Sequence, residues 1–245
     1  MLNLILIKDK SVVEPILEQT IIDLHLQPAQ TMDELIKLFR LRQEKNTKSQ
    51  CGSVESLYLD VTERRIGRSC DYETQAKDYS GKQGTHTIKN SVINDEWQFI
   101  HFAGQTFRGA IHDKKMATIE LPNLSALSNW NLFFSKDKAY QKYEPEGVQC
   151  LAPFKATRNN PLNDVQIKFN ALISSIRIVS EHAIGGIKRC RINKDKLRYF
   201  EATFRDKIFS ISCGLHNLRV TRRKINYLNS AMRTRARINL NFSYT

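Results

Sequence analysis

Two short apolar runs, each closed by an acidic residue, constrain the fold of this chain more than any other feature. The first is SLYLDV, which carries Asp60 near its end, and the second is NLFFSKDKAY, which contains Asp137. Runs of this length are typical of buried central strands. Ligands of open α/β sheets sit at the carboxyl ends of the strands, so both acids are candidates for a site at that edge.

The segments around these runs predict the rest of a mixed sheet. THTIKNSVI and WQFIHFAG alternate in character on either side of Asp95-Glu96, which predicts a hairpin with a short turn. The stretch ERRIGRSCDYETQAKDYSGKQG is predicted to be a polar loop, HDKKMATIELPNLSAL a helix that Pro122 kinks or ends, and VQCLAPF one more strand. A strand, a hairpin, a helix, a strand and a helix in this order predict an α/β domain with helices packed on a mixed sheet.

Residues 11–45 read as a pair of helices with Pro28 between them, because apolar residues recur at intervals of three and four. Thr31 and Glu34 make a capping box at the start of the second helix. The polar stretch EKNTKSQCGS then serves as a linker. We therefore expect an N-terminal helical segment at 1–50, a main domain at 54–220 and a basic C-terminal tail at 221–245.

A long amphipathic helix, or a pair of helices, is predicted from Asp164 to Arg189. At about 100° per residue, its core face is bordered by a narrow stripe of Arg177, Glu181 and Lys188. Such a border position lets a carboxylate reach the edge of a sheet, although the stripe also fits an ordinary ion pair between Arg177 and Glu181. Two adjacent glycines, 185 and 186, favour a place where another backbone or a ligand comes close, because glycine disfavours a helix.

The charge of the chain favours a polyanionic partner. Its formal net charge is +13, and residues 214–245 contain no acid. Neutralising phosphates releases counterions and adds affinity, so we expect nucleic-acid contacts, among them Arg222, Arg223 and Lys224. The alternative is that the excess charge only maintains solubility. Five dispersed cysteines argue against a disulfide framework and against a zinc ribbon, which indicates a reducing interior.

Carboxylates are what metal-dependent phosphodiester chemistry requires. A pair of divalent ions activates the attacking oxygen and stabilises the leaving one. Magnesium prefers hard oxygen ligands and keeps several waters, so two or three carboxylates suffice to hold the pair. No apolar stretch approaches the roughly 20 residues of a membrane span, so no membrane partner is expected.

Several ordered motifs make the chain resemble DDE-type insertion-sequence transposases related to the Harbinger group. They are YLDVTERRIGR, YSGKQGTHTIKNSVI, FAGQTFRGAIHDKKM, SKDKAY and RIVSEHAIGGIKR, with SCGLHNLRV at the end. The resemblance runs from about Tyr58 to Val220, and its most specific element is the spacing of Arg177, Glu181 and Lys188.

The resemblance implies a ribonuclease-H-like fold in which Asp60, Asp137 and Glu181 are the catalytic acids and bind two divalent ions, Mg or Mn. Asp113 is the main rival of Asp137. The resemblance further implies supporting positions for His112, Asp113 and Arg177, and DNA contacts for Lys82, His86 and Lys188. For Lys82 and His86, a hairpin entry with a solvated lysine fits equally well. The implied partner is double-stranded DNA, at transposon ends and at a target, bound by a homo-oligomer.

The chain departs from the family pattern at Ser69, where proline is common, and at Ala139, where glycine is usual. Residues 11–45 also lack the Gly-containing turn of a helix-turn-helix, which fits a truncated copy or half of a split reading frame, in either case a non-autonomous one. Three functions therefore stay open: a transposase, a catalytically silent DNA-binding remnant or regulator, and a structure-directed nuclease. We expect the protein in the cytoplasm or nucleoid of a prokaryote, or in a eukaryotic nucleus.

Overall fold

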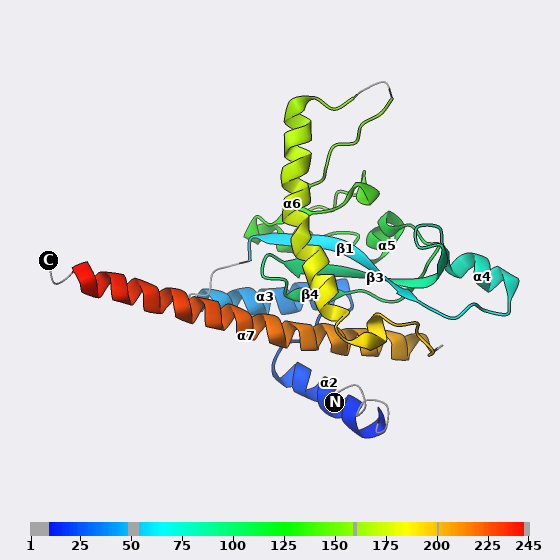
Figure 1. The fold of residues 1–245 in the computed structure, drawn as a ribbon, viewed down its shortest axis with the longest axis horizontal. Helices are drawn as coiled ribbons and strands as arrows, with labels where there is room; N and C mark the ends of the chain where they lie inside the picture. The colour runs from blue at the N-terminus through cyan, green and yellow to red at the C-terminus, as the bar shows by residue number, and fades with distance from the viewer. Residues whose placement is uncertain (1–9, 49–53, 159–160, 200, 243–245) are drawn as a thin grey trace.

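The computed structural model describes residues 10–48, 54–158, 161–199 and 201–242, and shows a curled mixed sheet flanked by helices (Figure 1). The helices are α2 (Lys10–Asp23), α3 (Met32–Lys48), α4 (Tyr72–Asp78), α5 (Asp113–Glu120), α6 (Asp164–Ile187) and α7 (Ala202–Phe242), with the 3-10 helices η1 (Ser125–Trp130), η2 (Lys138–Tyr140) and η3 (Arg191–Asn193). The strands are β1 (Ser56–Arg65), β2 (Tyr79–Ser80), β3 (Thr85–Asp95), β4 (Ile100–Ala103), β5 (Phe107–Arg108), β6 (Phe133–Ser135) and β7 (Gln149–Leu151).

Strand β1 lies in the middle of the sheet, as the SLYLDV run predicts. It pairs antiparallel with β3 on one side and parallel with β6 on the other. β7 continues the parallel half, whereas β2, β4 and β5 all pair with β3. This mixed sheet with flanking helices confirms the ribonuclease-H-like fold.

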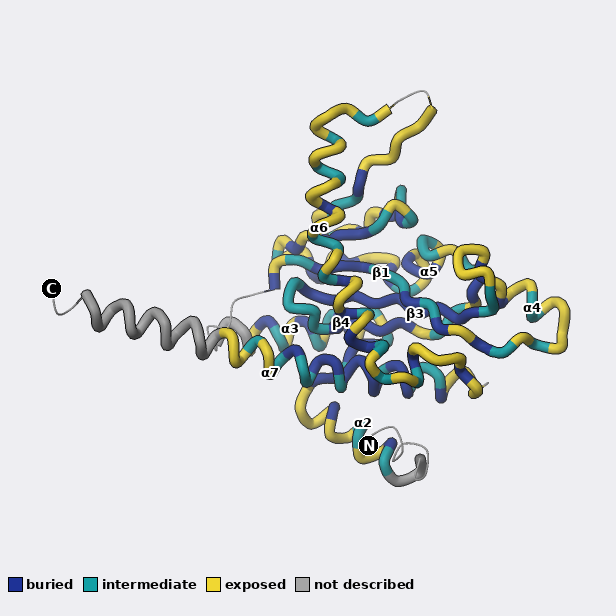
Figure 2. Tube along the Cα trace, viewed as in Figure 1, coloured by how far each residue is buried: buried dark blue, intermediate teal, exposed yellow. Residues whose placement is uncertain are grey.

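The two faces of the sheet are buried by different helices. Leu57 and Leu59 of β1 point toward α3, α5 and η1, where they form the larger core with Phe134 of β6. Val92 of β3 points to the opposite face, where α6 and α7 close a second core. Because successive side chains of a strand alternate in direction, β1 carries its polar residues Asp60 and Thr62 on the α6 face. The covered strands form the dark centre of Figure 2.

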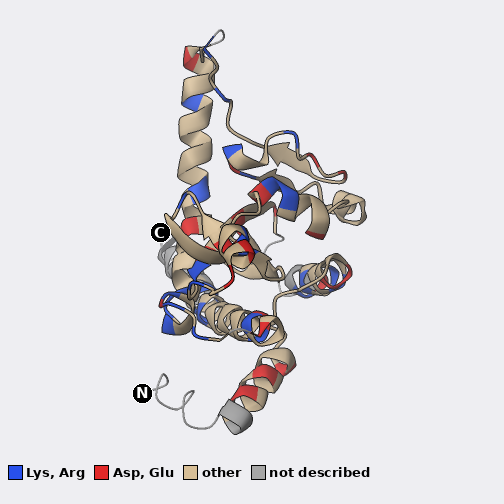
Figure 3. Cartoon of the chain, turned by 90° about the vertical axis from the view of Figure 1, so that its right-hand side faces the viewer, with Lys and Arg blue, Asp and Glu red and all other residues tan. Residues whose placement is uncertain are grey.

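The two predicted N-terminal helices are confirmed as α2 and α3, with Pro28 between them. Glu34 N donates to Thr31 Oγ1 at 3.3 Å, while the Glu34 carboxylate accepts from Gln30 N, one residue earlier than a capping box requires. Helix α2 packs on α7, where Lys207 Nζ lies 2.9 Å from carboxylate oxygens of Glu14 and Glu18. The acidic residues of α2 form its red bands in Figure 3.

Two local predictions were wrong. The turn of the β3–β4 hairpin is longer than two residues, because Asp95 closes it by accepting from the N–H groups of Trp97 and Phe99, each at 2.9 Å. Gln98 takes the positive φ of 70° that this turn requires. The predicted polar loop contains the short helix α4, which Asp71 caps by accepting from Thr74 N at 2.7 Å.

The long helix predicted from Asp164 is confirmed as the single helix α6. Asn163 and Gln166 form a reciprocal capping box at its start. Its N-terminal half projects beyond the sheet and is mostly exposed, whereas its C-terminal half crosses β1 (Figures 1 and 2). The stretch predicted as a basic tail continues α7 as far as Phe242. Within the described residues, no helix is long and apolar enough to cross a membrane.

Glu120, at the end of α5, makes the stability of the fold depend on pH. Burial raises the pKa of Glu120 from 4.5 to about 7, and neighbouring Ser91 and Gln105 offset this only in part. A raised folded-state pKa costs stability as pH rises from the unfolded to the folded value. Glu120→Gln is therefore expected to increase the free energy of unfolding by up to roughly 3 kcal/mol above pH 7 and to change nothing below pH 4.5.

Urea denaturation of both proteins at several pH values measures this difference. The matched control is Glu44→Gln, because Glu44 is exposed on α3. An equal gain for Glu120→Gln at low and at high pH would contradict the electrostatic explanation.

Candidate active site

Asp60 lies in the middle of β1, on the face that α6 covers. Its neighbour Val61 packs against the larger core on the other face, so strand alternation directs the Asp60 carboxylate toward α6. Asp60 Oδ1 accepts from Val61 N at 2.8 Å. Burial raises the pKa of Asp60, as does the nearby charge of Asp137, while the Val61 N–H and Arg177 lower it.

Asp137 reaches the same place from β6. The parallel register pairs Tyr58 with Ser135; Asp60 lies two residues further along β1, and Asp137 lies two residues after Ser135, just past the end of β6. The two carboxylates therefore leave the sheet at the same level, where the side chain of Asp137 is 39% exposed. Asp137 also caps η2, since its Oδ1 accepts from Lys138 N at 2.5 Å.

The predicted stripe of α6 lies over these two acids. Arg177 Nη1 is 3.1 Å from Asp137 Oδ1, so the arginine pairs with the acid from β6 and not with Glu181. Lys188, the C-cap of the helix, is half-buried, and the charges of Glu63 and Asp60 partly offset the lowering of its pKa by burial. Both ends of the stripe thus face the Asp60–Asp137 pair.

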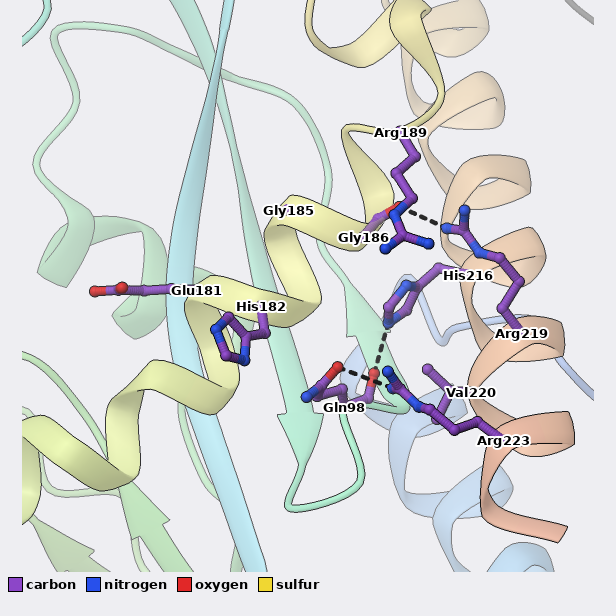
Figure 4. A pocket seen from close by; sticks show the side chains of 10 residues that line it. All are labelled: Gln98, Glu181, His182, Gly185, Gly186, Arg189, His216, Arg219, Val220 and Arg223. Carbon is purple, nitrogen blue, oxygen red and sulfur yellow. Dashed lines mark hydrogen bonds between the residues drawn. The ribbon is translucent and has the colours of Figure 1, made fainter. Parts of the chain in front are cut away.

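Glu181 lies between Arg177 and Lys188 on this stripe, but its carboxylate is exposed. The preceding residue, Ser180, is buried and donates to Asn94 Oδ1 of β3 at 2.7 Å, which fixes this turn of α6 on the sheet. Figure 4 shows the Glu181 side chain extending away from the groove between α6 and α7. The structure therefore brings two of the three predicted acids together and leaves the third exposed on α6.

Asp113, the rival of Asp137, has a different partner. Its Oδ1 accepts from Lys89 Nζ of β3 at 2.9 Å, and the same ammonium donates to Ile111 O at 2.9 Å and lies 3.8 Å from Glu63 Oε1. His112 caps α5 by accepting from Lys114 N at 3.2 Å, with its side chain exposed. Asp113 thus belongs to a charge cluster centred on Lys89.

Comparison with known proteins identifies the class of this site. A family model described as DDE superfamily endonuclease matches residues 59–217, more than half of the chain and a range that includes all three acids. The chain belongs to the DDE superfamily endonucleases. A probable transposase for insertion sequence element IS702 from Microchaete diplosiphon is 30% identical over 141 residues, 57% of this chain and 49% of that protein.

The chain thus spans about half the length of this curated relative. No solved structure matches it. The ordered motifs are confirmed as those of a DDE-type insertion-sequence transposase.

The DDE superfamily implies divalent metal use in general, and the two aspartates fit that requirement. Each uses Oδ1 in a hydrogen bond and leaves Oδ2 without a hydrogen-bond partner in the described part of the chain. Burial and the charge of Asp137 raise the pKa of Asp60, and a divalent cation bound there would stabilise its ionised form. Among the described residues, no three His, Cys, Asp or Glu side chains converge to hold a metal.

Tyr140 lies near the two aspartates, and in the sequence only its place in the SKDKAY motif points to it. Its side chain is 1% exposed, and its hydroxyl has no hydrogen-bond partner in the described part of the chain. Burial and the neighbouring acids, Asp113 first and then Asp60 and Asp137, raise its pKa well above the ordinary value. The hydroxyl is therefore an available donor beside the two aspartates.

The predicted DNA contacts of the DDE domain occupy several places. Lys82 lies in the exposed turn before β3 and lowers the pKa of Asp60 slightly. His86 packs edge-on against Tyr79, with the ring centroids 5.7 Å apart. On α7, Arg222 is exposed, Arg223 donates to Gln98 Oε1 at 3.0 Å, and Lys224 lies 4.7 Å above the ring of Trp97.

Proposed function

We propose that this chain is the catalytic domain of a transposase, which cuts DNA at the ends of an insertion sequence and joins the freed end to a target. The observation that carries the proposal is the pair of Asp60 and Asp137, which leave adjacent parallel strands at one level beneath the basic stripe of α6. The similarity to a probable transposase supports it. The chain spans about half of that relative, so recognition of the insertion-sequence ends by this chain is also part of the proposal.

In this proposal Asp60, Asp137 and Glu181 hold two divalent ions, magnesium or manganese. When bound, the ions stabilise the attacking and leaving oxygens of the phosphodiester. Arg177 holds Asp137 in place through the 3.1 Å ion pair. Lys188 lies beside Asp60, where its ammonium can contact the DNA backbone. Glu181 sits between these cations on the same helix stripe and completes the set when DNA and metal are present.

The reaction has two balanced steps. In the first, water attacks a phosphorus atom, the bond to the bridging 3′-oxygen breaks, and that oxygen takes a proton to become a 3′-hydroxyl. In the second, this hydroxyl attacks a target phosphodiester, the target's bond between phosphorus and its own 3′-oxygen breaks, and that oxygen takes up the proton that the attacking hydroxyl releases, so no external energy source is needed. Both steps displace an oxygen in line, so one set of acids serves both.

The proposed partner is double-stranded DNA, bound by a homo-oligomer that holds element ends and target together. The net charge of +13 supplies sequence-independent affinity for phosphate. Lys82, His86 and Lys188 are the proposed contacts near the acids, with Arg222, Arg223 and Lys224 on α7. Similarity to an insertion-sequence transposase supports a cytoplasmic place of action, on the chromosome of a bacterium.

The test is cleavage of an end-labelled duplex that carries the element ends. With magnesium or manganese, the purified chain is expected to nick the duplex and leave a 3′-hydroxyl, and a chelator should stop the reaction. The absence of cleavage in either metal would contradict the proposal. Equal cutting of branched or single-stranded DNA without preference for the ends would favour a structure-directed nuclease instead.

A second candidate is a catalytically silent DNA-binding protein derived from a transposase. The observation in its favour is the exposed carboxylate of Glu181, which does not converge with Asp60 and Asp137 in the described structure. This candidate predicts binding of duplex DNA that a chelator leaves unchanged, with no nicking at any metal concentration.

A further inference from the structure

A basic groove lies between the C-terminal half of α6 and helix α7 (Figure 4). It has a volume of about 550 Å³ and is open to solvent. Arg189 borders it from the α6 side, and Arg219 and Arg223 project into it from α7. The α7 arginines are four residues apart and therefore share one helix face. The spacing of Arg219 and Arg223 can be read from the sequence, but only the fold shows that Arg189 lies on the opposite wall of the groove.

The groove is a built feature in which side chains hold the two helices at a fixed separation. A Cβ atom added at Gly186 would lie 2.2 Å from Nδ1 of His216, so only glycine lets α6 approach α7 this closely. Arg219 Nη2 donates to Gly186 O at 2.5 Å, and His216 Nε2 lies 2.8 Å from Gln98 O. A Cβ atom at Gly185, in contrast, meets nothing within 4 Å, because this glycine faces the open groove.

The three arginines carry positive charge that no acid neutralises. In the described part of the chain, none of them forms an ion pair. Burial lowers the pKa of Arg219, and the charges of Arg189 and Arg223 lower it further. Burial, together with these arginines, lowers the pKa of His216 to about 4, so the ring is neutral at neutral pH. The guanidinium groups of Arg189, Arg219 and Arg223 therefore repel one another, and a bound anion would relieve this repulsion.

The composition of the groove indicates which anion. Its lining contains no Phe, Tyr or Trp among the described residues, and its only rings there are the imidazoles of His182 and His216, the second of which is held against Gln98 O. Guanidinium groups match phosphate oxygens, and a row of them suits successive phosphates of a duplex backbone. Glu181 belongs to the lining of the groove, although its side chain extends away from it, so a backbone lying in the groove runs past the turn of α6 that carries this proposed acid.

We infer that the α6–α7 groove binds the phosphodiester backbone of duplex DNA next to the point of cleavage, through Arg189, Arg219 and Arg223. The inference rests on the proposed function, because it assigns a place to the DNA which that function requires. The groove positions the duplex by its phosphates and reads no base sequence.

The first test measures how the affinity for duplex DNA depends on salt, with the whole chain carrying Asp60→Asn so that the duplex stays intact. Arg189→Ala with Arg223→Ala is expected to weaken binding about tenfold and to lower the slope of log affinity against log salt by about 1 to 2. Arg219 is left in place because it anchors Gly186. The matched control is Lys37→Ala with Arg40→Ala, which removes the same charge from the exposed side of α3 on the opposite face of the sheet.

Equal slopes for the two double variants would overturn the inference. Such a result differs from a failure of the proposed function, which would show as absent cleavage by the unsubstituted chain while the groove variants still lose affinity. Binding is thus scored without reference to catalysis.

A second test places a reporter on the floor of the groove. Gly185→Cys has room for its side chain, and the duplex is expected to protect this thiol from alkylation, read by mass spectrometry of the labelled peptide. Inorganic phosphate and a mononucleotide at the same phosphate concentration should not protect it. Equal protection by these small anions, or none by the duplex, would overturn the inference.

Discussion

Replacing Asp137 by asparagine is expected to lower the rate of DNA cleavage about 1,000-fold or more, and Asp60→Asn should do the same. Both carboxylates leave adjacent parallel strands at one level, and each retains an oxygen available for a metal ion. An asparagine keeps the shape of the side chain but replaces one carboxylate oxygen by an amide nitrogen, which cannot serve as an anionic ligand. The fold should persist, because Asp137 is 39% exposed.

Asp113→Asn is the matched control, since it makes the same change in a third nearby acid. Lys89 would lose its 2.9 Å ion pair but keep its hydrogen bond to Ile111 O, so the cluster should survive and cleavage should fall only a few-fold. The measurement is the initial rate of nicking with excess metal, alongside a thermal unfolding curve for each variant. Loss of cleavage in Asp113→Asn, with cleavage retained in Asp137→Asn, would make Asp113 the second acid.

The largest loss of stability is expected at Arg64 of β1, whose side chain is 1% exposed. Its guanidinium donates to Asn90 Oδ1 at 2.7 Å and to Thr106 Oγ1 at 3.2 Å, and it lies 4.8 Å above the ring of Phe209. Burial lowers the pKa of Arg64 to about 10, so the group is charged at neutral pH. It joins the central strand to β3 and to α7.

Arg64→Met is therefore expected to lower the free energy of unfolding by about 3 to 5 kcal/mol, because the acceptors around it remain buried without their donor. Arg65→Met is the control. The side chain of Arg65, the next residue of β1, is exposed, so its replacement should change the free energy of unfolding by no more than about 0.5 kcal/mol. Guanidinium denaturation followed by circular dichroism measures both. Coincident transitions for the two variants would show that the buried network contributes nothing net.

Much of the fold could be predicted from periodicity. The apolar run before Asp60 indicates a buried strand, and the pattern from Asp164 indicates one long helix, because both signals arise from local alternation between core and solvent. Helix α4 was missed since its residues are polar and only the Asp71 cap marks its start. The hairpin turn was misjudged because the carboxylate of Asp95 folds the chain back over several residues, an interaction without a periodic signal.

The site was predictable only in part. The stripe of Arg177, Glu181 and Lys188 follows from helix geometry, yet the partner of Arg177 does not, because Asp137 reaches it from a distant strand. The same limit applies to Lys89, which reads as a strand residue in sequence and becomes the centre of a charge cluster only when α5 packs beside β3. Contacts between elements far apart in the chain carry this information.

Because β1 pairs with β6, the distance between the two aspartates does not depend on the length of the chain that joins them. The intervening segment contains a hairpin, α5 and η1, but the backbone ladder, not that segment, sets the spacing. Surface turns within it can therefore gain or lose residues over evolution without moving either carboxylate. A slip of one residue in the register of β1, in contrast, would turn Asp60 to the opposite face of the sheet and away from Asp137.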